Sequence, residues 1–316
     1  MTGRADATGR TGAPAVQITG LVKRYGARTA VDGLDLTVPA GSVTAVLGPN
    51  GAGKTTTIEC CEGFRRPDAG RVRVLGLDPS RQRRALAPRI GVTLQSGGAW
   101  GAVRAMELLR YVARLYADPL DVDVLADRLG LSSAGRTPFR RLSGGQQQRL
   151  SLATAVVGRP EVVFLDEPTA GLDPAARHAV WEVVADLRSA GVTVVLCTHL
   201  MDEAEQLADL VAVVDAGRVV AADTPAALTR LGAENTIRFG GPPGLPAQSL
   251  ADALPEGTAV AEAGAGRYVV SGPVTPGSLA TVTAWCAAHG VLPDGLSVER
   301  ATLEDVFLSL TGRDVR

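Results

Sequence analysis

The sequence has no excess of charge of either sign and no long apolar run. Its 316 residues include 32 basic and 33 acidic side chains, for a net charge of −1, so no strong field would draw the whole protein onto nucleic acid or acidic lipid. The longest apolar candidate, residues 210–222, is interrupted by Asp215 and Arg218 and falls short of the roughly 18 residues that a membrane-spanning helix needs. The first fifteen residues lack the apolar core of a signal peptide. We therefore expect a chain that is made in the cytosol and stays there, without nucleic acid as a partner.

Cysteine and lysine are also scarce. The four cysteines show neither a C-x-x-C motif nor a Cys/His ligand spacing, which indicates neither a disulfide framework nor a zinc site. Lysine occurs only at Lys23 and Lys54, and all the other basic residues are arginine. Because the chain has kept so few lysines, each of the two needs a specific reason.

The overall composition is that of a globular protein. A hydrophobic content of 46% and a charged content of 21% fall in the globular range, and the length suits one large domain with a smaller one. From residue 16 onward, apolar strand-like runs alternate with helical patterns, which predicts an α/β fold. We expect a flexible tail over residues 1–15, a main domain over 16–235 and a small C-terminal α/β appendage, an accessory domain, over 236–316. The Gly- and Pro-rich residues 240–246 form the clearest linker.

The apolar runs and turn signals place individual elements. Strands are expected at 16–25, 32–38, 42–47, 70–74, 90–94, 162–166, 193–198 and 211–215, and in the appendage at 267–270. Helices are expected at 56–64, 103–117, 146–157 and 279–288, and a last helix begins at Thr302, where Asp305 three residues later suits a helix cap.

One glycine-rich loop carries a specific chemical signal. Residues 48–55, Gly-Pro-Asn-Gly-Ala-Gly-Lys-Thr, fit the pattern G-x-x-x-x-G-K-[ST] between a predicted strand and a predicted helix. Glycines let successive backbone N–H groups turn toward an anion, and the helix N-terminus adds its positive end. Lys54 would reach the β- and γ-phosphates of a nucleotide, and the Thr55 hydroxyl would bind Mg²⁺. The alternative is a glycine-rich turn with an incidental lysine, which the strand–loop–helix context and the scarcity of lysine disfavour.

Two carboxylates follow another apolar run. Residues 162–165 are apolar and lead into Asp166 and Glu167, which predicts a buried parallel strand with acidic residues at its carboxyl end. Ligands bind at that end of the strands in such folds. Asp166 therefore suits a second Mg²⁺ contact, and Glu167 suits the group that orients an attacking water or accepts its proton. Taken alone, the pair would fit a solvated acidic loop equally well.

A second candidate anion site precedes another helix. Ser143, Gly144 and Gly145 stand before the helical pattern that begins at Gln146, so they provide a second helix N-terminus with exposed backbone amides. One phosphate chain does not need two such cradles, which suggests that the second one serves a nucleotide held by another copy. The structural alternative is an ordinary serine-capped helix.

These residues together resemble the ATP-binding subunits of ABC transporters, over most of residues 16–235. Residues 48–56 resemble the Walker A loop, 142–146 the LSGGQ signature, and 162–167 the Walker B strand with its catalytic glutamate. The resemblance implies a P-loop NTPase fold with a core parallel sheet, an antiparallel β subdomain and a helical subdomain. It implies ATP and Mg²⁺ as cofactors. The residues implied to contact the nucleotide are Tyr25, Gly48, Pro49, Asn50, Gly51, Ala52, Gly53, Lys54, Thr55, Thr56, Ser143, Gly144, Gly145, Gln146 and Asp173.

The resemblance also assigns catalytic and metal-binding roles. It implies Lys54, Gln95, Glu167 and His199 as catalytic residues, and Thr55, Gln95 and Asp166 as Mg²⁺ ligands.

Four residues depend on the resemblance for their roles. Tyr25 looks like the aromatic that stacks on adenine, Gln95 like the Q-loop glutamine, Asp173 like the D-loop aspartate and His199 like the switch histidine. Taken alone, the tyrosine and the histidine would fit strand ends and the glutamine a surface amide. Asp202, Glu203 and Glu205 are interpreted as the acidic first turn of the next helix.

A finer resemblance points to exporters. Leu94-Gln-Ser-Gly-Gly in place of the more common Pro-Gln form, the run from Asp166 to Pro174 and the ending from Leu303 to Arg313 are similar to daunorubicin-type drug-resistance ATP-binding proteins. This resemblance implies an ATPase on the cytoplasmic face of the cell membrane that powers export by a separately encoded permease. It also implies a homodimer that closes head to tail around two MgATP, with a drug, antibiotic or other hydrophobic compound as cargo.

Other functions stay open at this point. An exporter of lipid, polysaccharide or peptide would carry the same motifs, because the cargo contacts lie in the membrane partner. An importer ATPase with a regulatory tail is disfavoured by the short tail. A soluble ABC ATPase acting on DNA or ribosomes is disfavoured because residues 55–141 contain no heptad pattern and the chain has one set of motifs.

Overall fold

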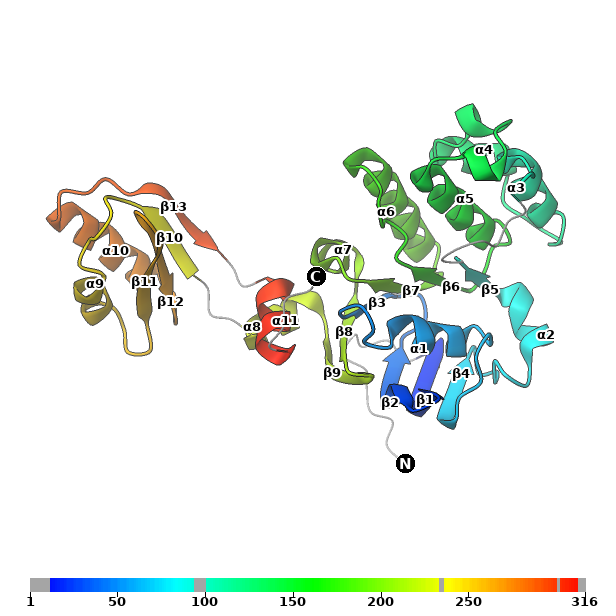
Figure 1. The fold of residues 1–316 in the computed structure, drawn as a ribbon, viewed down its shortest axis with the longest axis horizontal. Helices are drawn as coiled ribbons and strands as arrows, with labels where there is room; N and C mark the ends of the chain where they lie inside the picture. Colours follow the sequence, from blue (N-terminus) through cyan, green and yellow to red (C-terminus); the bar gives the residue numbers. More distant parts are fainter. Residues whose placement is uncertain (1–11, 94–100, 233–235, 300–301, 312–316) are drawn as a thin grey trace. The chain divides into compact units, whose positions relative to one another are not determined.

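The computed structural model describes residues 12–93, 101–232, 236–299 and 302–311, and it divides into two compact units (Figure 1). The first unit extends to Pro225, and the second begins at Ala226. Each unit has its own sheet structure and its own apolar core. Among the described residues, no helix is long and apolar enough to cross a membrane.

A six-stranded sheet forms the centre of the first unit, in the order β5-β6-β7-β3-β8-β9. The strands from β5 to β8 in this order are parallel, and β9 pairs antiparallel with β8. Strands β3, β6 and β7 are buried along their whole length, which explains why their sequences are continuous apolar runs rather than alternating ones. The strands are β3 (Val43–Leu47), β5 (Ile90–Val92), β6 (Val162–Asp166), β7 (Thr193–Thr198), β8 (Leu210–Asp215) and β9 (Arg218–Asp223).

A smaller antiparallel sheet, ordered β2-β1-β4, shares a core with one face of the central sheet. Along β2, buried Leu34, Leu36 and Val38 alternate with exposed residues, as expected for a sheet with one face in the core. Helix α1 adds Ile58 and both of its cysteines to the same core. The elements of this layer are β1 (Val16–Tyr25), β2 (Arg28–Val38), β4 (Ala69–Val74) and α1 (Lys54–Cys61).

Helices cover the other face of the central sheet. Val163 and Leu165 of β6 belong to the core between these helices and the central sheet. The intervening Phe164 belongs to the core shared with the antiparallel sheet, because successive residues of a strand point to opposite faces. Helix α3 is amphipathic, contacts α4 and α5, and contributes Leu109 to this core. Besides α1, the α-helices described in the first unit are α2 (Arg83–Leu86), α3 (Ala105–Ala113), α4 (Val122–Arg128), α5 (Gly144–Val156), α6 (Pro174–Ser189) and α7 (Met201–Leu207).

The second unit contains an antiparallel four-stranded sheet in the order β11-β12-β10-β13. Its chain order β-α-β-β-α-β is that of a ferredoxin-like plait, and α9 and α10 share its core. Tyr268 and Phe239 stack in that core with ring centroids 5.2 Å apart. The elements of the unit are α8 (Pro225–Gly232), β10 (Thr236–Gly240), α9 (Ala247–Ala253), β11 (Ala259–Gly264), β12 (Arg267–Ser271), α10 (Pro276–Ala288), β13 (Asp294–Glu299) and α11 (Leu303–Thr311).

Most elements expected from the sequence are present with small changes at their ends. The strands at 16–25, 162–166 and 193–198 are β1, β6 and β7. The strand expected at 32–38 begins earlier, at Arg28, because it forms a hairpin with β1. The helix expected over 103–117 is shorter, and Thr302 precedes α11 with its hydroxyl accepting the N–H of Asp305, as predicted for a cap.

Residues 240–246 are not a linker. They lie inside the second unit and connect β10 to α9, and the Leu245 N–H donates to the Tyr268 hydroxyl at 2.9 Å. Glycine and proline do mark a break in regular structure here, but the break is a loop within one folded unit. Strand β10, which precedes the loop, was not expected although it lies at the centre of that sheet between β12 and β13.

Candidate active site

The glycine-rich loop lies between β3 and α1, as the motif predicts. Gly53 has a φ of 101°, and a Cβ there would meet the Ala30 carbonyl oxygen at 2.4 Å. A Cβ on Gly48 would stand 2.2 Å from the Val214 carbonyl oxygen. The loop is therefore wedged between the backbones of β2 and β8, and glycine is required at both positions.

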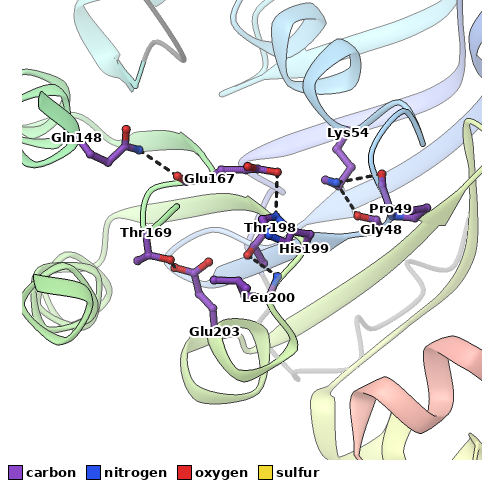
Figure 2. A network of polar contacts seen from close by, with 10 residues as sticks. All are labelled: Gly48, Pro49, Lys54, Gln148, Glu167, Thr169, Thr198, His199, Leu200 and Glu203. Atoms are coloured by element: carbon purple, nitrogen blue, oxygen red, sulfur yellow. Dashed lines mark hydrogen bonds and ion pairs between the residues drawn. The ribbon is translucent and has the colours of Figure 1, made fainter. Parts of the chain in front are cut away.

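Lys54 is buried at the start of α1, with 5% of its surface exposed. Its Nζ donates to the carbonyl oxygens of Gly48 at 2.5 Å and of Pro49 at 3.1 Å, so the side chain lies along the loop (Figure 2). The ammonium group is thus placed beside the amides of the helix N-terminus, where an anion would be stabilised by both.

Asp166 ends β6 and is buried. Burial raises the pKa of its carboxyl above the ordinary value, while a hydrogen bond with Thr55 and the charge of Lys54 act in the opposite direction. The Asp166 N–H donates to the Thr93 hydroxyl at 3.1 Å, which fixes the strand end. The structure therefore brings together Thr55 and Asp166, two of the residues expected to hold Mg²⁺.

Glu167 has a left-handed backbone with a φ of 48°, which is unusual for a residue other than glycine. Its N–H donates to the Cys197 carbonyl oxygen at 2.9 Å. Its Oε1 lies 3.0 Å from Nδ1 of His199, the residue after β7 (Figure 2). An ionised carboxylate only accepts hydrogen bonds, so this contact places the imidazole proton on Nδ1 and leaves Nε2 facing away from the glutamate.

The loop that carries His199 is held by a local turn. The Leu200 N–H donates to the Thr198 hydroxyl at 2.9 Å, immediately on either side of the histidine. The side chains of Glu167 and His199 remain 26% and 33% exposed, so water can reach the pair. A carboxylate that is accessible to water and oriented by an imidazole can accept a proton from that water.

Gln148 also contacts Glu167, and it is not among the site residues expected from the sequence. From the second turn of α5, its Nε2 donates to the Glu167 carbonyl oxygen at 3.0 Å (Figure 2). Its place in a run of three glutamines after the Ser-Gly-Gly motif is its only sequence signal, because the contact joins residues far apart in the chain.

Glu203 differs from its sequence interpretation. It lies in the first turn of α7, as expected, but the side chain is completely buried rather than solvated. Its Oε1 accepts the Thr169 hydroxyl at 2.9 Å, and burial raises the pKa of its carboxyl. This contact joins the segment after Glu167 to the helix after His199.

Ser143 and Asp173 both cap helices. The Ser143 hydroxyl accepts the Gln146 N–H at 3.2 Å, and the Gln146 side chain accepts the Ser143 N–H at 3.0 Å, which together form a capping box at α5. The Asp173 side chain accepts the Ala176 N–H at 2.9 Å at the start of α6. These contacts agree with the structural alternative considered for Ser143, and they leave the backbone amides of Gly144 and Gly145 at the helix N-terminus.

Tyr25 ends β1 with 42% of its surface exposed. The Lys23 Nζ lies 5.6 Å and the Arg65 Cζ 5.9 Å from the centre of its ring, so two cations are within cation–π distance of this tyrosine. Lys23 is in turn held by Asp68 at 3.1 Å. Gln95, the last of the expected site residues, lies outside the described residues.

The sequence and fold are similar to those of characterised proteins. The family model described as ABC transporter matches residues 31–170. The daunorubicin resistance ATP-binding protein DrrA3 of Streptomyces coeruleorubidus is 40% identical, with 96% of this chain and 97% of that protein covered. The Nod factor export ATP-binding protein I of Ralstonia nicotianae is 37% identical, with 96% and 95% covered.

A solved structure has a similar fold over much of this chain. The structure of an ATP-binding subunit of an ABC transporter superposes with a TM-score of 0.63 at 25% identity. The match covers 69% of this chain and 92% of that one. The chain therefore shares the α/β fold of an ABC transporter ATP-binding subunit.

Proposed function

This chain belongs to the ATP-binding subunits of ABC transporters, ATPases that power export by a separate permease, and we propose that its catalytic centre lies at the ends of β3, β6 and β7, where the residues described above meet. The observation that carries the proposal is the convergence of Lys54, the Thr55–Asp166 contact and the Glu167–His199 pair at neighbouring strand ends. These residues follow or end three different strands, β3, β6 and β7, so the arrangement is a property of the fold rather than of one motif.

ATP is the substrate, with its phosphates against the glycine-rich loop, Lys54 and the N-terminus of α1. Adenine would stack on Tyr25, whose ring is already flanked by two cations. Mg²⁺ would be held by Thr55 and Asp166, whose oxygens are hard donors that already share a hydrogen bond. When bound, Mg²⁺ neutralises charge on the β- and γ-phosphates. Gln95 is proposed as a further ligand on the resemblance alone.

Glu167 is proposed to act on the attacking water. Its carboxylate accepts a proton as the water oxygen bonds to the γ-phosphorus, and the bond from that phosphorus to the bridging oxygen of ADP breaks. His199 donates from Nδ1 to the carboxylate and turns Nε2 toward the γ-phosphate. The 3.0 Å contact between the two side chains supports this division of roles.

Two copies of the chain are proposed to close head to tail. The amides of Gly144 and Gly145, with the Ser143 hydroxyl proton, would contact the nucleotide bound to the other copy. The Ser143 oxygen accepts a bond in its capping box, so its proton is available for donation. Loss of the γ-phosphate removes this contact and shifts the pair toward an open state.

The cargo is proposed to be a drug, an antibiotic or another hydrophobic compound, moved by a permease with this chain at the cytoplasmic face of the membrane. The 40% identity with a daunorubicin resistance protein supports this choice. The 37% identity with a Nod factor export protein, over a similar share of the chain, supports export of a different compound as the second candidate.

The experiment is an affinity pull-down of the Glu167→Gln variant from detergent-solubilised membranes of the native host, with and without MgATP. We expect a membrane protein with several spanning segments to co-purify, and its sequence then indicates the cargo class. Recovery of only soluble or ribosomal partners would contradict the export assignment while leaving the nucleotide chemistry in place. The Lys54→Ala variant is the control that separates nucleotide-dependent capture from constitutive assembly.

A further inference from the structure

Glu167 occupies a backbone conformation that its own chemistry does not favour. Its φ of 48° lies in the left-handed region, where a side chain with a Cβ is strained unless neighbouring groups hold it. The direction of its carboxylate depends on this conformation, because rotation about φ or ψ would swing the side chain away from His199. Whatever holds the backbone therefore also sets the orientation of the carboxylate.

Both backbone polar groups of Glu167 have tertiary partners. The N–H donates to the Cys197 carbonyl oxygen of β7 at 2.9 Å, a contact between neighbouring strands. The carbonyl oxygen accepts the Ala170 N–H at 3.2 Å in the turn that follows, and it also accepts Nε2 of Gln148 at 3.0 Å, a donor from helix α5 (Figure 2). The contact with Cys197 fixes one side of the residue to the sheet, and the Gln148 contact fixes the other side to a helix.

Helix α5 is held in place around the Gln148 contact. The capping box of Ser143 and Gln146 closes its first turn. Arg149 Nη1 donates to the Leu129 carbonyl oxygen at 2.8 Å. Gln148 is thus placed by neighbours that are themselves fixed, and its amide faces away from them toward Glu167.

We propose that Gln148 is a positioning residue for hydrolysis: it holds the main chain of Glu167 in the left-handed conformation that aims the carboxylate at the attacking water. The assignment rests on the proposed role of Glu167. It also joins Glu167 to the helix that begins at Ser143, so the geometry of one site follows the position of the signature helix in the same chain.

The test compares two neighbouring glutamines on α5. Gln148→Met keeps the length of the side chain and removes its donor, and Gln148→Glu replaces the donor with an acceptor that faces the Glu167 carbonyl. Gln147→Met is the matched control, because Gln147 Nε2 also donates to backbone carbonyl oxygens, but to those of Phe139 and Leu142, at 3.2 and 3.3 Å, instead of that of Glu167. Each full-length variant is measured for kcat and KM of ATP hydrolysis, for the Kd of a fluorescent ATP analogue and for Tm.

We expect both Gln148 variants to lower kcat by about 10- to 100-fold, since a small misplacement of a catalytic group has effects of this size. The Kd should stay within about twofold of wild type, because Gln148 lies outside the phosphate loop. Gln147→Met should keep kcat within about twofold of wild type. In the Glu167→Gln background, Gln148→Met should cause no further loss, since it acts through the group already removed.

The proposal is overturned if Gln148→Met retains wild-type kcat, if it weakens ATP binding and Tm as much as kcat, or if it still lowers the residual rate of Glu167→Gln. These outcomes are distinct from failure of the proposed active site. In that case Glu167→Gln itself would hydrolyse ATP like wild type.

Discussion

The two units bury their polar side chains very differently. Among the described residues, every buried charged side chain belongs to the first unit: Lys54, Glu62, Asp166 and Glu203. The second unit packs aromatic and aliphatic side chains against its sheet, and its buried Ser278 is part of a helix cap. Buried charges cost free energy unless they are compensated, so burial of Lys54 and Asp166 costs the first unit stability at the proposed catalytic centre.

The comparison separates residues kept for chemistry from residues kept for folding. In the first unit, strain and buried charge meet at Glu167, Asp166 and Lys54, beside the ends of β3, β6 and β7. In the second unit, hydrogen bonds such as that from the Tyr268 hydroxyl to the Pro242 carbonyl oxygen at 2.7 Å complete a packed core. Substitutions in the two units should therefore change different properties.

The largest effect is expected for Glu167→Gln. The amide keeps the shape of the side chain but cannot accept the proton of the attacking water, so ATP turnover should fall by about 1,000-fold. Nucleotide binding should persist, and light scattering should detect an ATP-dependent dimer. A variant that stays monomeric with ATP would contradict the two-copy scheme.

Lys54→Ala should reduce ATP affinity by about 100-fold, because it removes a charged donor to the phosphates from a buried position. Equilibrium titration with a fluorescent nucleotide measures this directly. Lys23→Ala, which removes the other lysine, is the matched comparison and should weaken binding far less, since Lys23 supports Tyr25 rather than the phosphate loop. An equal loss of ATP affinity in the two variants would contradict the specific role of Lys54 at the phosphate loop.

Glu62 offers a test of the buried charge itself. Its burial, reinforced by the neighbouring charges of Asp166 and Glu59, raises the pKa of its carboxyl to about 8. Between the ordinary carboxyl pKa and pH 8 the folded state retains a proton that the unfolded state has lost, so the free energy of unfolding should fall as pH rises. The expected decline is about 2 kcal/mol between pH 6 and pH 8.

Urea unfolding of the nucleotide-free chain at several pH values measures this slope. Glu62→Gln should flatten it and raise stability at pH 8. Glu161→Gln is the control, because the hydrogen bond from Arg89 lowers the pKa of the Glu161 carboxyl and places its titration below this pH range. An unchanged slope in Glu62→Gln would assign the pH dependence to other groups.

The smallest effect is expected in the second unit. Tyr268→Phe removes a buried hydroxyl that donates to Pro242 and accepts from Leu245, at a cost of about 1 kcal/mol to the stability of that unit. Calorimetry of the full chain should detect this change, and kcat for ATP should remain at the wild-type value. Tyr111→Phe, at a tyrosine that is 57% exposed, should leave both unchanged.

The phosphate loop and the central strands were predictable because their signals are local. The pattern of residues 48–55 requires glycine where the backbone passes β2 and β8, and the continuous apolar runs of β6 and β7 follow from burial on both faces. The Asp166–Glu167 pair could be placed at a strand end for the same reason.

The second unit was harder to predict. Strands β11 and β13 are largely exposed and rich in small or polar residues, so no apolar alternation marks them. Their pairing with β12 and β10 comes from the topology of the sheet, in which they are the two edge strands. The prediction of a linker at residues 240–246 is wrong because glycine and proline indicate where regular structure ends, but they do not distinguish a loop within one unit from a connection between two units.

Short motifs and periodic burial were enough to predict the fold class, the proposed nucleotide chemistry and most of the residues proposed to perform it. Two contacts become visible only in the folded protein: Gln148 reaches the Glu167 carbonyl, and Glu203 is buried against Thr169. Both contacts join side chains to partners distant in sequence. Spacing along the chain does not predict such contacts, because only the packing of α5 and α7 near the sheet brings the partners within hydrogen-bond distance.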